Sequence, residues 1–211
     1  MRCLLLLLAV VICPAATPGT VFLEELTWTE VGDLLKAGTT TIIVPTGGTE
    51  QNGPHMVLGK HNFRVRWNAE RIARKLGGTL VAPVMAYVPE GEINPPTGHM
   101  RFAGTITLPD EFFRKVLEFT ARSLRQHGFK DIVLIGDSGP NQPGMQAVAE
   151  LLNREWTPDT RVHHIPEYYR GHGFEEWLAS QGETKAAIGT HAGISDTSLL
   201  MAIDSRWIRR D

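Results

Sequence analysis

Two kinds of hydrophobic pattern alternate along the chain. Runs of apolar and β-branched residues occur at 39–45, 79–88 and 131–135, and residues 161–166 (RVHHIP) are a further strand candidate. Because polar residues do not alternate with apolar ones in these runs, the runs are typical of parallel strands that are buried on both faces. Pro83 lies inside the second run and disfavours a regular strand in its middle. The pattern predicts up to four strands.

Segments with helical periodicity separate these runs. The most regular one begins at Pro109 and ends near His127, just before Gly128. The candidate helices, each with an apolar stripe or with a capping or stop residue, cover residues 27–37 (with Thr27 or Thr29 as N-cap), 63–76, 109–127, 142–154, 174–181 and 195–203. Alternation of buried strands with helices predicts an α/β fold: a three-layer α/β/α arrangement around a mostly parallel central sheet, in a single domain.

The first 17 residues have the pattern of a signal peptide. Arg2 supplies a positive charge, residues 4–12 form a short apolar core, and small residues follow at 15–17. The apolar core is much shorter than the ~20 residues that a membrane-spanning helix needs. We therefore expect a periplasmic or secreted protein with no stable membrane span after removal of the signal. A lipid anchor at Cys13 and a buried N-terminal helix are the less favoured alternatives.

Composition narrows the chemistry. Cys3 and Cys13 both lie in the signal segment, so the expected mature chain has no disulfide, no thiol nucleophile and no thiolate metal ligand. The chain is 42% hydrophobic and 21% charged, with a formal net charge of −2, which is ordinary for a globular domain. It shows no basic stripe with interleaved aromatic residues, so we expect no nucleic-acid partner. A metal would have to be held by His, Asp, Glu, Asn or water.

Polar, acidic and imidazole side chains gather in two loops that follow predicted strands. Residues 47–62 follow the first strand, and residues 136–142 follow the third. In open α/β sheets, ligands bind outside the carboxyl ends of the strands, and buried polar groups are costly unless they are paired or ligated. We therefore expect the functional site here. The alternative is that Glu50 and Asp137 only cap the helices that follow.

Residues 136–138 (GDS) support a different hypothesis. A Gly-Asp-Ser block after a strand resembles the nucleophile block of SGNH esterases, which would make Ser138 a nucleophile. That block normally lies on the first strand and is followed by an Asp-x-x-His pair near the C-terminus. Here the block comes late and no such pair exists. A serine hydrolase therefore stays an alternative.

Four ordered blocks of the chain resemble the motifs of the creatininase family. They are residues 45–59 (PTGGTEQNGPHMVLG), 98–108 (GHMRFAGTITL), 131–141 (DIVLIGDSGPN) and 191–198 (HAGISDTS). The corresponding family patterns are P-x-G-S-x-E-Q-H-G-P-H-L-P-x-x-T-D, H-x-x-F-P-G-T-I-x-L, a strand ending in N-G-H-G-G-N, and H-A-G-x-x-E-T-S. We therefore identify residues 24–211 as a creatininase-like hydrolase domain.

The resemblance implies a binuclear divalent-metal amidohydrolase that acts on a cyclic amide or a related C–N bond and forms a homo-oligomer. Glu50 lies at the position of a family ligand. Asn52 stands in place of a ligand histidine, and His61 in place of a bridging aspartate. Ser138 replaces another ligand histidine, and Pro140 replaces a ligand acid. Because an imidazole cannot bridge two ions as a carboxylate does, we expect one ion per site.

This divalent ion is expected to be Zn, Mn or Fe. Its candidate ligands lie in the two motif loops and are Glu50, His61 and Asp137, with Asn52 as a weaker one. His191 matches the family's catalytic histidine and is the expected general acid or base. Asp196 matches a nearby family glutamate and is expected to orient His191. Ser138 is kept as a candidate catalytic residue, and the candidate substrate contacts are His55, His99, Arg101 and Asn141.

The sequence thus predicts a metal-dependent hydrolase of a small amide, a lactam or another cyclic C–N substrate. Creatinine itself is a doubtful substrate, because Ala187 stands where creatininase has a tryptophan before its H-A-G block. Two alternatives stay open. One is a non-catalytic family member that binds a small ligand, and the other is the serine hydrolase that uses Ser138.

Overall fold

A parallel sheet forms the centre of the molecule in the computed structural model, which describes residues 19–171 and 173–209. In these residues the sheet has four strands in the order β2-β1-β3-β4, and every pairing is parallel. The strands are β1 (Thr41–Thr46), β2 (Thr79–Val81), β3 (Asp131–Gly136) and β4 (Arg161–His164). Thr46 pairs with Gly136, so β1 and β3 end side by side. The mostly parallel sheet predicted from the apolar runs is confirmed.

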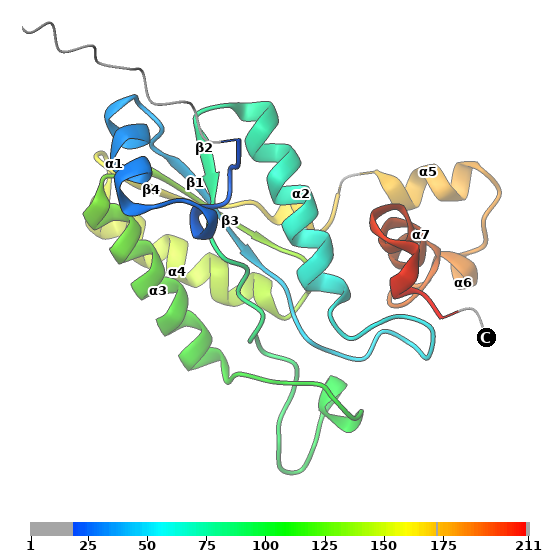
Figure 1. The fold of residues 1–211 in the computed structure, drawn as a ribbon. Coiled ribbons are helices and arrows are strands. Elements are labelled where there is room, and N and C mark those ends of the chain that lie inside the picture. The colour runs from blue at the N-terminus through cyan, green and yellow to red at the C-terminus, as the bar shows by residue number, and fades with distance from the viewer. Residues whose placement is uncertain (1–18, 172, 210–211) are drawn as a thin grey trace, which may run out of the picture.

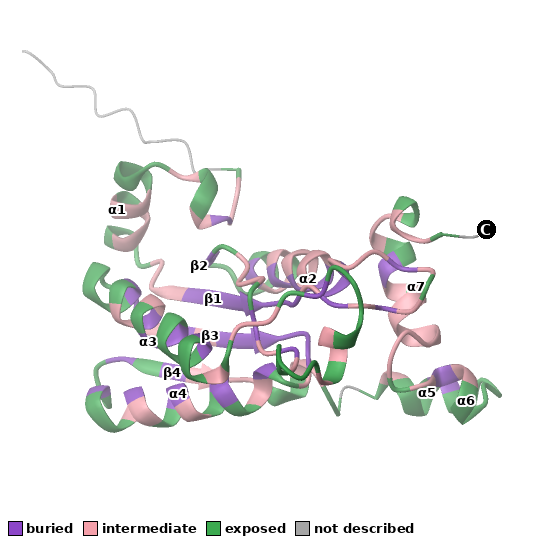
Figure 2. Ribbon diagram, turned by 90° about the horizontal axis from the view of Figure 1, so that it is seen from below, coloured by how far each residue is buried: buried purple, intermediate pink, exposed green. Residues whose placement is uncertain are grey.

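Helices cover both faces of this sheet (Figure 1). One face carries α2 (Lys60–Leu76), and the other carries α3 (Asp110–His127) and α4 (Asn141–Trp156). Side chains of β1 alternate between the two, because Ile42 packs in the core with α3 and α4 whereas Ile43 packs in the core with α2. Figure 2 shows the buried strands between the exposed outer faces of these helices. The three-layer α/β/α prediction is confirmed.

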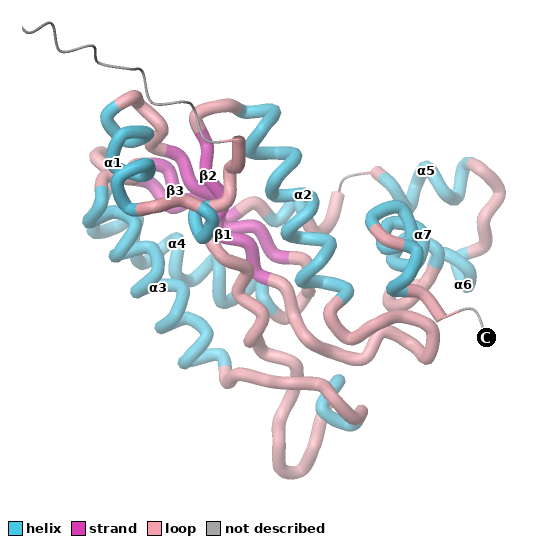
Figure 3. The backbone as a smooth tube through the Cα atoms, viewed as in Figure 1, coloured by secondary structure: helices cyan, strands magenta, loops and turns pink. Residues whose placement is uncertain are grey.

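The remaining helices lie at the two ends of the chain. Near the N-terminus, α1 (Trp28–Lys36) begins at Thr27, whose side chain forms a capping box with Glu30. The C-terminal helices α5 (Phe174–Ser180), α6 (Lys185–Ile188) and α7 (Ile194–Ile203) form a separate group beside the start of α2 (Figure 3). Because α7 packs against α2, the loop between α6 and α7 reaches the carboxyl edge of the sheet. Short 3-10 turns complete the described elements: Leu23–Glu25, Gly98–Arg101, Pro166–Tyr168 and Ser205–Trp207.

Two predicted boundaries were wrong in ways that matter for the site. The second strand ends at Val81 rather than at residue 88, because Pro83 has no N–H to donate to the sheet. Beyond it the chain makes only isolated bridges, such as Thr46 with Met85. Helix α2 begins at Lys60 rather than Phe63, after a Gly59 N-cap that has no side-chain bond. The earlier start places residues 60–64 on one helix.

The predicted signal peptide, residues 1–17, and the lipid-anchor alternative at Cys13 lie outside the described residues. Over the residues that are described, every helix is too short or too polar to cross a bilayer.

Candidate metal centre

The candidate site lies where β1 and β3 end. The loop after β1 carries Glu50, and the turn after β3 carries Asp137; both side chains are buried. His61, on the first turn of α2, lies between them. Its Nε2 is 2.7 Å from Glu50 Oε1, and its Nδ1 is 2.7 Å from Asp137 Oδ2. The sequence therefore placed these three residues correctly in one cluster.

Both ring nitrogens of His61 are occupied by carboxylate oxygens. A lone pair on His61 is available to a metal only after one of these two hydrogen bonds has been replaced. Its predicted role as a ligand therefore stays a prediction. In the structure, His61 is a bridge between two anions.

A chain of buried ion pairs continues from Asp137 toward the C-terminal helices. Arg64 Nε lies 2.9 and 2.8 Å from the two oxygens of Asp137, and its Nη1 lies 2.6 Å from Asp196 Oδ1. Lys60, only 1% exposed, places its Nζ 3.1 Å from Asp196 Oδ2. Two cations from one face of α2, Lys60 and Arg64, thus balance the carboxylates of Asp137 and Asp196.

These partners hold the acids ionised despite their burial. Burial alone would raise the pKa of Asp137, but Arg64 and the hydrogen bond from His61 outweigh it and lower that pKa. Burial would also raise the pKa of Asp196, and Lys60 with Arg64 brings it well below its usual value. Burial has the largest effect on Lys60 and lowers its pKa, although the Asp196 carboxylate acts in the opposite direction. The buried charges therefore depend on one another.

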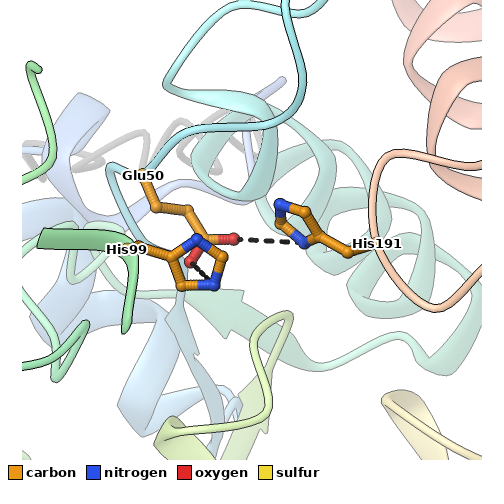
Figure 4. A group of neighbouring side chains, drawn as sticks. All are labelled: Glu50, His99 and His191. Atoms are coloured by element: carbon orange, nitrogen blue, oxygen red, sulfur yellow. Dashed lines mark ion pairs between the residues drawn. The ribbon is translucent and has the colours of Figure 1, made fainter. Parts of the chain in front are cut away.

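A second cluster shares Glu50 and opens toward the exterior. Glu50, His99 and His191 each present one ligand atom, and these atoms lie within 4.8 Å of one another (Figure 4). His99 Nε2 lies 3.2 Å from Glu50 Oε2, and His191 Nδ1 lies 3.8 Å from Glu50 Oε1. The two imidazoles converge on a buried carboxylate from the 3-10 turn after residue 97 and from the loop before α7. Three ligand atoms gathered in this way could hold a single divalent ion.

The predicted ligand set and this cluster overlap only at Glu50. His99 was expected to contact substrate and His191 to transfer protons, yet both offer nitrogens to the same point as Glu50. Asp196 does not contact the His191 ring; instead, its Oδ2 accepts a hydrogen bond from Ala192 N at 2.9 Å and so holds the loop that carries His191. Asp196 can therefore position His191 only indirectly, by holding the backbone of the neighbouring residue Ala192.

Glu90 lies beside Glu50 and is 2% exposed. Its two oxygens, like Glu50 Oε2, have no hydrogen-bond donor among the described residues. Two carboxyl groups in contact stabilise one shared proton. Burial and the neighbouring Glu50 raise the pKa of Glu90 to about 10. For Glu50, burial acts in the opposite direction to His61 and Glu90, and these two partners bring its pKa to about 2.

Two predicted residues support the loop rather than pointing into the cluster. The Asn52 amide nitrogen donates to Glu50 O at 2.8 Å and to Val57 O at 3.2 Å, while its Oδ1 has no partner among the described residues. Asn141 donates to Gly47 O at 2.8 Å. These amides fix the path of the loop that carries Glu50.

Three further predicted residues lie apart from the clustered imidazoles. His55 Nε2 pairs with Thr197 Oγ1 at 2.9 Å. Arg101 is exposed, and its Nε is 3.5 Å from Pro96 O. Ser138 is buried, and no hydrogen bond joins its Oγ to an imidazole in residues 19–171 and 173–209. Within the described chain, the geometry gives Ser138 no base.

Lys60, Arg64 and Glu90 belong to the site but were not predicted from the sequence. Lys60 and Arg64 are four residues apart, so they share a helix face, and this signal was hidden because the helix was expected to begin at Phe63. Glu90 is a single acid in a loop rich in Pro and Gly. No sequence signal marked it.

A parallel α/β/α domain with a buried glutamate and two convergent imidazoles beside the strand ends belongs to a general class: α/β proteins whose candidate functional site lies at the carboxyl edge of the sheet. Residues 24–211 match the family model "Creatininase: Creatinine amidohydrolase". The chain belongs to the creatininase family.

Two similar proteins of known activity are hydrolases. The chain is 25% identical over 190 residues to the creatinine amidohydrolase of Pseudomonas putida, covering 87% of this chain and 72% of that enzyme. It is 30% identical over 134 residues to the mycofactocin precursor peptide peptidase of Mycobacterium tuberculosis, covering 57% of this chain and 51% of the peptidase. A solved manganese form of creatininase superposes with a TM-score of 0.72 at 25% identity, over 90% of this chain and 75% of that one. The chain thus spans about half of one relative and about three quarters of the others.

Proposed function

We propose that the protein is a metal-dependent hydrolase that cleaves a C–N bond in a small amide, a lactam or another cyclic substrate. The observation that carries the proposal is the convergence of Glu50, His99 and His191 to within 4.8 Å at the carboxyl edge of the sheet. Membership in a family of hydrolases agrees with it. A manganese form of a related structure supports a divalent ion as cofactor.

The residues present fit one ion. Among the described residues, no group makes a well-formed hydrogen bond to the buried Glu50 Oε2, although His99 Nε2 lies 3.2 Å away. A buried carboxylate oxygen in this position is costly unless a cation or a proton compensates it. Two imidazole nitrogens approach the same carboxylate. One carboxylate and two imidazoles form the three-ligand set of catalytic zinc sites, and they also suit Mn and Fe. Glu50, His99 and His191 would therefore hold the ion.

A divalent ion supplies Lewis-acid polarisation of a substrate carbonyl and makes water a better nucleophile near neutral pH. The chain itself supplies position and charge. Glu50 is held by His61, and the loop of His191 is held by Asp196. The side chains of His99 and His191 are 27% and 31% exposed, so a small substrate reaches the cluster from their side.

His191 has only one nitrogen that faces the cluster, because its Nε2 lies 2.9 Å from Gln51 O. That single Nδ1 cannot bind an ion and transfer a proton in the same step. We assign it to the ion. The proton-transfer role expected from the sequence is the competing assignment.

Peptides compete with cyclic amides as the substrate class, because one relative is a peptide peptidase. The test is a panel of small lactams, cyclic ureides and short peptides, assayed after removal of metal and again with added Zn²⁺ or Mn²⁺. We expect metal-restored hydrolysis of a cyclic member of the panel and its loss in Glu50→Gln. Glu111→Gln, an exposed change of the same kind on α3, is the matched control. Equal rates in Glu50→Gln and wild type would refute the proposal.

One observation favours a second candidate, a non-catalytic protein that binds a small ligand. Lys60 and Arg64 already balance the carboxylates of Asp137 and Asp196. His61 forms hydrogen bonds with both Glu50 and Asp137. A site that is neutralised from within needs no metal to be stable. Failure of the purified protein to bind Zn²⁺ or Mn²⁺ by calorimetry would favour this candidate. A homo-oligomer and export from the cytoplasm stay predictions of the sequence.

A further inference from the structure

The side chain of Gln51 lies between the two imidazoles of the candidate metal centre. Its Nε2 is 3.1 Å from His99 Nδ1 and 3.2 Å from His191 Nε2. The two rings are themselves neighbours, with centroids 4.8 Å apart. Gln51 therefore contacts both rings on the nitrogens that face away from Glu50.

One hydrogen bond fixes the direction of this amide. Gly53 N donates to Gln51 Oε1 at 3.0 Å, in a turn where Gly53 has a φ of +68°. Because Oε1 is engaged there, the NH₂ group is the one that faces the imidazoles. An amide NH₂ only donates hydrogen bonds.

This orientation of the Gln51 amide favours a His99 tautomer that cannot bind a metal through Nε2. His99 Nδ1 has to accept from the NH₂ group, so in a neutral ring the proton is on Nε2. That nitrogen is the one that faces Glu50 Oε2. A lone pair for an ion appears at His99 Nε2 only when Nδ1 carries the proton and an acceptor faces it.

Two groups of Gln51 contact His191 Nε2, and they require opposite protonation of that nitrogen. The backbone oxygen of Gln51 lies 2.9 Å from His191 Nε2 and requires a proton there, whereas the NH₂ group at 3.2 Å requires a lone pair. The shorter contact favours the proton on Nε2, which leaves Nδ1 free to bind an ion. The contact between the two donors is then unfavourable.

Turning the amide over removes both conflicts. Oε1 would then accept from His99 Nδ1 and from His191 Nε2, and each ring would present a lone pair toward Glu50. The cost is the hydrogen bond from Gly53 N, about 1 kcal/mol for an ordinary bond, together with the repulsion between the turned NH₂ group and the N–H of Gly53. A cation that binds at Glu50 favours the turned state.

We propose that Gln51 is a positioning residue whose side-chain amide reverses when a divalent cation binds, exchanging its bond to Gly53 for bonds to His99 and His191. The inference rests on the proposed function only in that the cation binds at Glu50, His99 and His191. Gln51 does not contact the ion. It determines which nitrogens are available to the ion.

The substitution Gln51→Glu lets the side chain accept hydrogen bonds from Gly53 N and from the imidazoles at the same time. A carboxylate accepts from Gly53 N with one oxygen and from the imidazoles with the other, so the metal-binding tautomer of His99 exists before the ion arrives. We expect Zn²⁺ to bind this variant about tenfold more tightly than wild type, the lower end of outer-shell effects. Gln126→Glu, an exposed change on α3 that adds the same charge, is the control and is expected to leave the affinity unchanged.

The measurements are Zn²⁺ calorimetry and long-range ¹H–¹⁵N NMR of the imidazoles, with His99 assigned by the loss of its signals in His99→Gln. Expected results for His99 are an Nε2 proton in metal-free wild type, and an Nδ1 proton both in zinc-loaded wild type and in metal-free Gln51→Glu. Tighter binding without a change of tautomer would reflect added charge alone and would overturn the proposal. So would an Nδ1 proton in metal-free wild type, a measurement that does not depend on the variant folding. Wild type that binds no Zn²⁺ would instead sink the proposed function.

Discussion

Asp196 on α7 accepts a 2.6 Å hydrogen bond from Arg64 on α2. Both side chains are largely buried, and Lys60 holds the second oxygen of the same carboxylate. The C-terminal helices are therefore joined to the α/β layers by charge at the edge of the candidate site.

Removing the Asp196 charge is expected to destabilise the protein strongly. Asp196→Asn leaves Lys60 and Arg64 short of a buried counter-ion, which typically costs about 3–5 kcal/mol. Urea unfolding followed by circular dichroism gives the change in free energy. Asp33→Asn, which breaks an exposed pair with Lys36, is the control, with an expected loss below about 1 kcal/mol. Similar losses in the two variants would show that the buried network contributes no more than a surface pair.

His61 and His99 are expected to differ in their effect on metal affinity. His99→Gln removes a ligand nitrogen of the cluster around Glu50. His61→Gln removes a neighbour that holds Glu50 through hydrogen bonding, for which a loss of about tenfold is typical. Calorimetry with Zn²⁺ should therefore give a larger loss for His99→Gln. A larger loss for His61→Gln would restore the ligand set predicted from the sequence.

Substitution of His191 is expected to weaken metal binding, and not only to slow substrate turnover. His191→Ala should weaken Zn²⁺ binding at least tenfold, by analogy with the loss that outer-shell changes already cause. His163→Ala, which removes an imidazole paired with Asp131 on the sheet, should leave the affinity unchanged. If His191→Ala binds zinc as wild type does but turns substrate over slowly, His191 is the general acid or base instead.

Glu90 gives the metal-free protein a dependence on pH. Its pKa of about 10 in the folded state lies above the ~4.3 of an exposed glutamate. A raised pKa means that the stability contributed by the protonated group is fully present below pH ~4.3 and is lost as the pH rises toward 10. Glu90→Gln removes this loss, so the variant should be more stable than wild type at pH 8, by up to ~1.4 kcal/mol for each pH unit above pH ~4.3.

Thermal unfolding at pH 4 and pH 8 checks this prediction. The advantage of Glu90→Gln should be large at pH 8 and small at pH 4, and the exposed Glu111→Gln should show no such trend. An equal effect at both pH values would mean that Glu90 is ionised in the folded protein.

The fold was predictable because its signals are local. The buried strands β1 and β3 and the ends of α3 follow from apolar runs and from stop residues such as Gly128. The error at residues 82–88 has a local cause as well, since an apolar run does not distinguish a strand from buried irregular chain around Pro83. Pattern reasoning succeeds where one segment determines its own conformation.

The site was only partly predictable because it depends on distant segments. Glu50, His61 and Asp137 were placed together because strand ends are neighbours in a parallel sheet. That His99 and His191 reach Glu50 depends on the paths of two long loops, which no periodicity reports. The ion pairs of Lys60 and Arg64 with Asp196 depend on how α7 packs on α2. Sequence periodicity does not report that packing either.

The three convergent side chains come from residues 50, 99 and 191, and the last of them is held by α7. A ribosome makes the chain from the N-terminus, so the first two are available long before the third. The cluster of Glu50, His99 and His191 can form only after residue 191 and helix α7, which holds its loop, have been synthesised. A chain terminated before residue 191 would therefore lack the third side chain of the candidate site, even if its sheet were complete.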